Sequence, residues 1–520
     1  MTITGSPRPP TGVPHRADAA VRNAGSGRRP VALVVFAVAG LAGVACSLHI
    51  ARGGPLLAVR WRLLAALAAW AGAWLVAVAA AFRLPRRAAV PLIVAVAVAL
   101  RLAALAGPPT TSDDLFRYSW DGRVQAAGID PYEYTPGATQ LAPLREPWLW
   151  PQDRPCPLAH RPLACTRINR SWVHTIYPPG AEAWFAAVYR LTGIGARYKA
   201  WQVAGLLTDI AVVALLAAAL RRRGKDPRWV ALYALCPAPV LEIVNNGHID
   251  GLAILLSLVA LAVASPGRRV DAPAPGVGSA TSRAPGAFTA VNAAPAPPVA
   301  ILHWRELAAG ALVGLATLVK LYPAFLVIPL VAAPPHRRTR SWPWVGGAAA
   351  AVVVAGYLPH VVLVGGKVVG FLPGYLREEH YDGAGRYLVA GALRIPGGLA
   401  GAVSALALVA AAAWVWSRRP PVATGAAVLM GTLLLAASPV QPWYGVTLLA
   451  FATLAAEPVW ATVVAAGYPY FFAVILLHPH RVGIGQVAYG LAAAAVGGAV
   501  LLRGFREPGR SMKGCPPNGC

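Results

Sequence analysis

The chain has 520 residues, of which 57% are hydrophobic and only 13% are charged. A water-soluble domain could not bury so much apolar side chain, and this composition also excludes a disordered chain and a small disulfide-stabilised protein. Lys and Arg outnumber Asp and Glu by 46 to 20, a net charge of +26. In a membrane protein such an excess collects in cytoplasmic loops, so it indicates topology and not nucleic-acid binding.

Fourteen apolar runs predict an all-α integral membrane protein, because each could form all or most of a bilayer-spanning helix. The runs are 31–50, 63–82, 88–106, 201–220, 229–244, 248–264, 307–320, 321–333, 344–364, 399–416, 422–437, 444–456, 459–477 and 484–502. Several are short, which a helix bundle tolerates, so we expect about 14 transmembrane helices.

The segments between these runs differ in composition and define the predicted organisation. Disorder is expected in a Pro-, Gly- and Arg-rich cytoplasmic tail and in an Ala-, Pro- and Gly-rich cytoplasmic loop. The predicted parts are the N-terminal tail (1–30), three transmembrane helices (31–106), a large outer catalytic loop with short helices (107–200), further helices (201–264), the disordered loop (265–303), the last helices (304–502) with a second outer loop (365–386), and a cytoplasmic tail (503–520). The first tail has no short apolar core before a cleavage site, unlike a signal peptide.

Arginine clusters predict the orientation. Those at 83–87, 221–223, 337–340 and 418–419 all fall on one side when the spans alternate across the bilayer. Because cytoplasmic loops are rich in Lys and Arg, both termini are expected inside, and both long polar loops outside. The preference for Arg and Ala is typical of a GC-rich bacterial genome, which indicates a multi-pass protein of the bacterial cytoplasmic (inner) membrane.

The first outer loop begins with an adjacent carboxylate pair, Asp113 and Asp114, directly after a span and close to Arg117. One interpretation is that these residues cap a helix, since acidic groups favour its N-terminus. The other is that one carboxylate is a general base for an acceptor hydroxyl. The residues alone leave both open.

Aromatic residues follow in proline-rich turns. Tyr132 and Tyr177 either stack on a sugar or belong to the interfacial aromatic belt. Gln441, Trp443 and Tyr444 lie in a break between two late spans, where they either line a polar cavity or mark the interface.

Lys320 lies between two apolar runs, in Leu318-Val319-Lys320-Leu321-Tyr322-Pro323. A cation inside a membrane segment is costly and is therefore a functional hypothesis. It would suit a lipid phosphate, although it could instead snorkel to the interface. His248 and Asp250 are expected near the same outer mouth, and Arg377 belongs to a polar patch of the second outer loop.

The six cysteines lack metal-ligand spacing, so no metal site is predicted. Cys156 and Cys165 both lie in the first outer loop, in an oxidising compartment, which favours a disulfide between them. The alternative is two unpaired thiols. Cys46 and Cys236 lie in apolar runs and are expected to be free.

Several of these motifs, in this order, resemble the GT-C superfamily of membrane glycosyltransferases. The stretch Ser112-Asp113-Asp114-Leu115-Phe116-Arg117-Tyr118, followed by Gly128-x-x-Pro131-Tyr132, resembles the first outer loop of two groups. One is the catalytic subunit of the eukaryotic GPI mannosyltransferase, and the other is the actinobacterial polyprenol-phosphate-mannose-dependent mannosyltransferases. Lys320-Leu321-Tyr322-Pro323 is similar to an element of the former, and Pro442-Trp443-Tyr444 to one of the latter.

The resemblance implies a GT-C-type helix bundle that transfers a hexose, with mannose as the first candidate. The donor would be a polyprenyl-phosphate sugar, and the acceptor a hydroxyl of a glycolipid or glycan at the outer face. Asp114 aligns with the catalytic acidic residue, with Asp113 as the other candidate. The residues expected to bind the donor phosphate are Lys320, His248, Arg377 and Arg117, and those expected to line the acceptor site or cavity are Tyr132, Tyr177, Asp250, Tyr322, Gln441, Trp443 and Tyr444. The Asp-x-Asp spacing of the eukaryotic enzyme is absent, which argues against metal use. A lipid monophosphate donor requires no cofactor, and the use of a divalent cation stays open.

Two other classes of function compete with this one. A polytopic transporter or lipid flippase also buries charges in a helix bundle, but it predicts matched half-repeats and charges at the bilayer midplane. Here the charged residues gather at one mouth and no internal repeat is visible, which favours an enzyme. The third possibility is a non-catalytic assembly scaffold.

Overall fold

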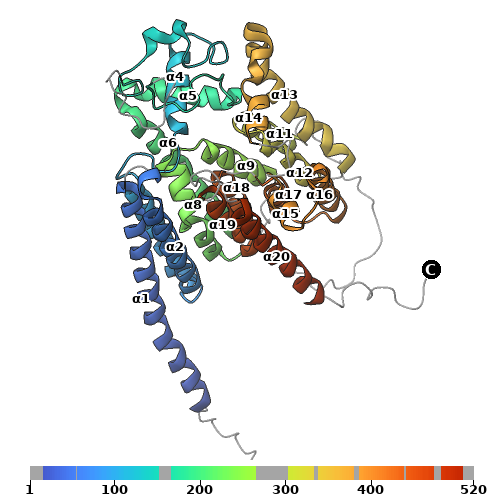
Figure 1. The fold of residues 1–520 in the computed structure, drawn as a ribbon. Coiled ribbons are helices and arrows are strands. Elements are labelled where there is room, and N and C mark those ends of the chain that lie inside the picture. The colour runs from blue at the N-terminus through green and yellow to red at the C-terminus, as the bar shows by residue number, and fades with distance from the viewer. Residues whose placement is uncertain are drawn as a thin grey trace, which may run out of the picture.

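A computed structural model describes residues 16–53, 56–151, 165–264, 303–332, 338–379, 386–438, 441–472 and 482–506. These residues form helices and connecting segments without a strand, which confirms the predicted all-α membrane fold (Figure 1). Residues 1–15 of the predicted disordered tail, residues 265–302 of the predicted disordered loop and residues 507–520 of the predicted cytoplasmic tail lie outside the described residues. The first helix begins at Arg16, within the tail that was predicted to be disordered.

The N-terminal part is a group of long helices with a polar unit above it. The long helices are α1 (Arg16–Arg52), α2 (Leu56–Ala81), α3 (Arg86–Ala104) and α6 (Arg197–Arg222). The polar unit contains α4 (Asp114–Ala126), η1 (Thr139–Leu144), α5 (Pro179–Thr192) and η2 (Ile194–Ala196). Helices α4 and α5 lie at the end of the molecule opposite the start of α1 and the end of α20 (Figure 1).

The middle of the chain is broken into short helices, because prolines and a glycine interrupt it. The pieces are η3 (Pro227–Trp229), α7 (Val230–Ala234), α8 (Pro237–Pro239), the π-helix η4 (Val240–Asn245) and α9 (Asp250–Ala264). The chain bends by 116° between η4 and α9. Gly247 allows this bend with a φ of +68°, a value that costs a side-chain-bearing residue free energy.

The C-terminal part alternates long and short helices. They are α11 (Trp304–Val319), η5 (Tyr322–Leu326), α12 (Val327–Ala332), α13 (Arg338–Val364), η6 (Gly365–Val369), α14 (Leu372–Glu378), α15 (Leu388–Ala392), α16 (Gly397–Arg418), α17 (Val422–Ala437), α18 (Trp443–Ala455), η8 (Pro458–Trp460), α19 (Ala461–Tyr470) and α20 (Val482–Arg506). Helix α14 follows α13 and reaches toward the polar unit of α4 and α5.

Where the structure describes them, the fourteen apolar runs fall on helical segments, but these helices do not all have the length of a span. Within the described residues, seven helices are long and apolar enough to cross a membrane, or eight if the bent pair of η4 and α9 counts as one span. Three shorter apolar helices, Tyr322–Ala332, Val422–Ala437 and Trp443–Ala455, add to the bundle. Short helices can lie at membrane depth because neighbouring helices satisfy their end groups.

A buried ion pair joins three helices below the polar unit. Nε of Arg101 lies 2.6 Å from an Asp209 carboxylate oxygen, and both side chains are fully buried. The Tyr233 hydroxyl donates to the other Asp209 oxygen at 2.6 Å, and the Arg101 guanidinium donates to the Ala234 carbonyl at 2.7 Å. Removing one partner of such a pair leaves a buried charge uncompensated, so the pair fixes α3, α6 and α7 relative to one another.

Two asparagines at the bend hold the segment that leads into α4. The Asn245 amide oxygen accepts from the Thr110 backbone N–H at 3.0 Å, and that of Asn246 accepts from Thr111 at 3.1 Å. The Asn245 amide nitrogen donates to the Ala104 carbonyl, at the end of α3. The bend between η4 and α9 therefore sets the position at which α4, with Asp113 and Asp114, begins.

Candidate active site

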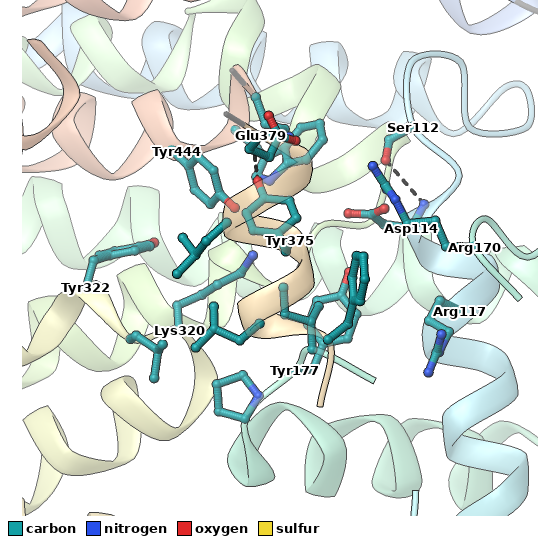
Figure 2. Close-up of a pocket in the computed structure, with 18 of the residues that line it drawn as sticks. Ser112, Asp114, Arg117, Arg170, Tyr177, Lys320, Tyr322, Tyr375, Glu379 and Tyr444 are labelled. Atoms are coloured by element: carbon teal, nitrogen blue, oxygen red, sulfur yellow. Dashed lines mark hydrogen bonds between the residues drawn. The ribbon is translucent and has the colours of Figure 1, made fainter. Parts of the chain in front are cut away.

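A cavity of about 490 Å³ opens between the polar unit and the C-terminal helices. Figure 2 shows its lining, which comes from α4, the segment before α5, the break between α11 and η5, α14 and the start of α18. One wall, formed by α17, is apolar and consists of Met430, Leu433, Leu434 and Ala437. The cavity thus joins a charged region to the surface of a short apolar helix.

Asp114 is the first residue of α4, and its carboxylate faces this cavity (Figure 2). The Asn169 side-chain amide donates to one of its oxygens at 3.0 Å, and the side chain is 19% exposed. The Ser112 hydroxyl accepts from the Asp114 backbone N–H at 3.2 Å, whereas Asp113, at the N-cap position, makes no capping hydrogen bond with its side chain. Ser112 therefore satisfies this helix end, and the Asp114 carboxylate is directed elsewhere.

Arg117 turns away from Asp114, although it lies in the next turn of α4 and contributes to the cavity lining (Figure 2). Its Nε donates to both carboxylate oxygens of Asp121, at 2.9 and 2.8 Å, and the pair is almost fully buried. The expected role of Arg117, holding a donor phosphate, thus competes with an ion pair that already engages this side chain.

Asp121 belongs to a buried acidic pair beneath the cavity. Burial raises its pKa, and the neighbouring Arg117 partly offsets that effect. Burial also raises the pKa of Glu182 on α5 well above its usual value, and the Asp121 charge raises it further. Glu182 accepts from the Thr175 hydroxyl at 2.7 Å, so this side chain links α5 to the segment that carries Tyr177.

Lys320 stands where α11 ends. Its backbone is extended, with φ −145° and ψ 142°, which releases the side chain from the helix surface into the cavity (Figure 2). Its ammonium lies 3.3 Å from an oxygen of the fully buried Asp250 and is itself 13% exposed. The rings of Tyr177 and Tyr444 lie 5.8 and 5.2 Å from Nζ, within cation–π range.

His248 and Asp250 lie behind the cavity wall and do not line it. The His248 ring is fully buried and stacks on Trp443 with the ring centres 3.9 Å apart. Its Nδ1 lies 3.7 Å from Asp114, and its Nε2 lies 3.7 Å from Glu242. His248 is therefore placed to orient Asp114 and Trp443, and contact with a donor phosphate is not available to it in this arrangement.

The remaining predicted residues divide between the cavity and its support. Tyr177, Tyr322, Gln441, Trp443 and Tyr444 line the cavity. Tyr132 is buried away from it, and its hydroxyl donates to the Tyr177 carbonyl at 2.6 Å. Arg377 is exposed and does not line the cavity.

Only one cysteine of the predicted disulfide lies within the described residues. Cys165 is disulfide-bonded, while Cys156 lies outside the described residues, so its pairing with Cys165 stays a prediction. Cys46 and Cys236 are free, as expected.

The sequence did not single out the cavity-lining residues Asn169, Arg170 and Tyr375, and it indicated Glu379 only as a member of the polar patch that also contains Arg377. Arg170 forms an ion pair with Glu378 on α14, with Nε 2.9 Å from a carboxylate oxygen. The side chain of Glu379 accepts from Gln441 at 3.0 Å and from Arg386 at 2.7 Å. These contacts join segments far apart in the chain, so only the polar patch around residues 377–380 gave a signal for them.

Chemically, the cavity combines a carboxylate, an ammonium and aromatic faces beside an apolar wall. A carboxylate can accept a proton from a hydroxyl, and an ammonium can stabilise a phosphate. Among the described residues, no group of three or more His, Cys, Asp or Glu side chains is arranged to hold a metal ion.

Comparison with known proteins identifies the class of this chain. No curated protein and no solved structure matches it. The model of glycosyltransferase family 87 matches residues 175–439, which is more than half of the chain and includes Lys320, Tyr375 and Glu379. The match supports a membrane glycosyltransferase over a transporter or flippase, and it does not extend to Asp114. The chain belongs to glycosyltransferase family 87.

Proposed function

We propose that this membrane glycosyltransferase takes a hexose, with mannose as the first candidate, from a polyprenyl-phosphate sugar. The acceptor is a hydroxyl of a cell-envelope glycolipid or glycan at the outer face of the bacterial cytoplasmic membrane. One observation carries the proposal: the Asp114 carboxylate and the Lys320 ammonium open into the same cavity, next to an apolar wall.

The donor is assigned from the chemistry of the cavity. The ammonium of Lys320 suits a phosphate, and the apolar side chains of α17 suit the first units of a prenyl chain. When the sugar–phosphate bond breaks, the phosphate leaves with the electron pair, and Lys320 stabilises the charge that develops on it. Because a protein cation performs this task on a monophosphate, we propose that transfer requires no divalent cation.

The acceptor hydroxyl is activated by Asp114 in this proposal. Its oxygen attacks the anomeric carbon as the phosphate leaves, and the hydroxyl proton moves to the Asp114 carboxylate. Asn169 holds that carboxylate from one side, and His248 lies behind it. The cavity's other wall carries Glu379, which is engaged by Gln441 and Arg386 and is not positioned as a second nucleophile. A single base is sufficient for one-step displacement, so we expect inversion at the anomeric carbon.

The experiment is transfer by membranes that contain this chain, supplied in turn with radiolabelled polyprenyl-phosphate mannose, glucose and arabinose. We expect label in a chloroform-soluble or glycan product with one of these donors, no label with the Asp114→Asn variant, and unchanged transfer in EDTA. Transfer from a nucleotide sugar but from none of the three lipid donors would refute the proposed donor. Loss of transfer in EDTA, restored by Mg²⁺ or Mn²⁺, would refute the cation-independent mechanism.

A further inference from the structure

A polar network on the cavity wall opposite Asp114 has no role in the chemistry described above. The Tyr375 hydroxyl donates to the Gln441 side-chain carbonyl at 3.2 Å, and the Gln441 amide donates to Glu379 at 3.0 Å. Arg386, almost fully buried, donates to the other Glu379 oxygen at 2.7 Å. Tyr375, Gln441 and Glu379 all line the cavity.

Hydrogen bonds hold Gln441 and Glu379 in place without using all of their donor and acceptor positions. A side-chain amide offers two N–H donors and a carbonyl with two lone pairs, and a carboxylate offers about four acceptor positions. Within this network, Gln441 uses one donor and one acceptor position, and Glu379 uses two acceptor positions. The donor and acceptor positions that remain on Gln441 and on the charged Glu379 could bind two neighbouring hydroxyls of a sugar ring.

The network also lies next to the place where the donor phosphate is expected. Tyr444, three residues after Gln441 in the chain, has its ring 5.2 Å from the Lys320 ammonium. Figure 2 shows Tyr375 and Glu379 on the same side of the cavity as Tyr444, with Asp114 across from them. A sugar bonded to a phosphate at Lys320 would therefore meet Glu379 and Gln441, and the acceptor would approach from the side of Asp114.

We infer that Glu379 and Gln441 form the subsite for hydroxyls of the donor hexopyranose and determine which sugar is transferred. Tyr375 orients Gln441, and Arg386 holds Glu379 in place. This inference rests on the proposed function and adds to it a sugar-recognition role for residues that neither hold the phosphate nor accept the proton.

The test uses deoxygenated donors. Wild-type membranes are given the best polyprenyl-phosphate hexose and its 2-, 3-, 4- and 6-deoxy analogues, and kcat/KM is measured for each. One or two analogues should fall roughly 10- to 100-fold, as expected for a lost hydrogen bond to a charged group. Glu379→Gln should lower kcat/KM for the complete sugar by a similar factor. It should add little to the loss already caused by the critical deoxy analogue, because both changes remove the same contact.

Glu133→Gln is the matched control, since Glu133 is a half-buried glutamate of the first outer loop that does not line the cavity. It should keep the wild-type pattern with all analogues. If Glu379→Gln misfolds because Arg386 loses its partner, Gln441→Ala, which removes no charge, should show the same lack of additivity with a deoxy donor. If, in both variants and for every analogue, the loss of kcat/KM caused by the substitution simply multiplied the loss caused by the missing hydroxyl, the proposed subsite would be wrong.

Failure of this inference differs from failure of the proposed function. If no lipid-linked donor is used by the wild-type protein, the proposed function is wrong. If a lipid-linked donor is used, but the effects of the Glu379 and Gln441 substitutions are non-additive only with deoxygenated acceptors, the proposed function holds and the donor subsite is wrong.

Discussion

The hydrogen bonds of Asp114 and its partly exposed side chain lead to a specific prediction for its substitution. Its helix end is satisfied by Ser112, so the carboxylate is not needed as a cap. Asp114→Asn should fold normally, keep donor KM within a few-fold, and lower kcat by roughly 10²–10⁴, the usual loss for a general base. Asp113→Asn is the control and should lose much less. Normal turnover of Asp114→Asn, with an inactive Asp113→Asn, would show that the two roles are exchanged.

Lys320 is expected to act on donor binding. Lys320→Ala removes the cation proposed to bind phosphate, so donor KM should rise strongly, and Lys320→Arg should recover part of it. The change also leaves Asp250 buried without its partner 3.3 Å away, which could reduce stability. The double variant Lys320→Ala/Asp250→Asn removes both charges; it should restore the thermal stability but not the donor affinity. If the donor KM were normal in either variant, Lys320 would not bind the donor phosphate and would serve only as the ion-pair partner of Asp250.

At the residue scale, sequence patterns found the cavity-lining lysine, carboxylates and aromatics but not their partners. Arg117 lies near Asp114 in the chain, which suggested an interaction, yet its helix position directs it to Asp121 one turn later. His248 is close to Asp114 in space but is buried behind it. Glu379 gains its position from Arg386 and Gln441, contacts that periodicity and spacing do not encode.

At the scale of elements, α11 carries Lys320 at its end, so the packing of α11 matters for the site. A Cβ on Gly310 would lie 2.3 Å from the Val345 carbonyl oxygen of α13, and one on Gly314 would lie 2.7 Å from that of Ala349. Small residues four apart allow such close approach of two helices. Gly310→Ala should destabilise the protein by about 1–3 kcal/mol, as overpacking does, and should reduce transfer.

Gly347→Ala provides the control on α13, because a Cβ there meets nothing within 4 Å. It should be neutral or slightly stabilising, since alanine is the better helix former. Thermal unfolding in detergent, followed by loss of the folded peak in size-exclusion chromatography, measures both variants. Equal stability of Gly310→Ala and Gly347→Ala would contradict the close packing of α11 on α13.

The polar unit should lose stability as pH rises, because burial raises the pKa of Glu182 well above its usual value. Below about pH 4.5, both the folded and unfolded states hold the proton. Above that pH the unfolded state releases it first, so the free energy of unfolding falls, by at most about 1.4 kcal/mol per pH unit from this group, until the pH passes the folded pKa. Glu182→Gln should flatten the fall in melting temperature between pH 5 and 8, whereas Glu378→Gln should not.

The elements themselves were largely predictable. Within the described part of the chain the apolar runs are helical, because a helix satisfies the backbone hydrogen bonds of an apolar segment in a bilayer. Their division into full spans and shorter pieces was not predictable, since it depends on local breaks. Pro237 and Gly247 interrupt the middle helices, and the extended backbone at Lys320 separates α11 from η5. The break at Lys320 lines the cavity, and the bend at Gly247 sets where α4 begins, so two of these positions that hydropathy does not assign contribute to the site.

At the scale of the whole molecule, four turns gather on one side. The turn after α2 meets the turn after α6, where Nε of Arg86 lies 3.2 Å from Asp226 and Arg228 donates to the Phe82 carbonyl at 2.7 Å. Lys225 donates to the carbonyl of Ala455, at the end of α18. Thr424, at the start of α17, donates to Glu457 at 3.1 Å. Most of these turns are rich in arginine, which favours the cytoplasm for this side and the outside for α4 and α5.

Orientation can be tested with single cysteines at two exposed positions, Gln140 in the polar unit and Arg221 at the end of α6. In intact cells, a membrane-impermeant maleimide should label Gln140→Cys and should not label Arg221→Cys. After the cells are broken, both should react, which shows that each cysteine is accessible. Labelling of Arg221→Cys alone in intact cells would place Asp114 and Lys320 in the cytoplasm. There a nucleotide sugar is the available donor, so this one result would remove the reason for a lipid-linked sugar and with it the proposed acceptor in the envelope.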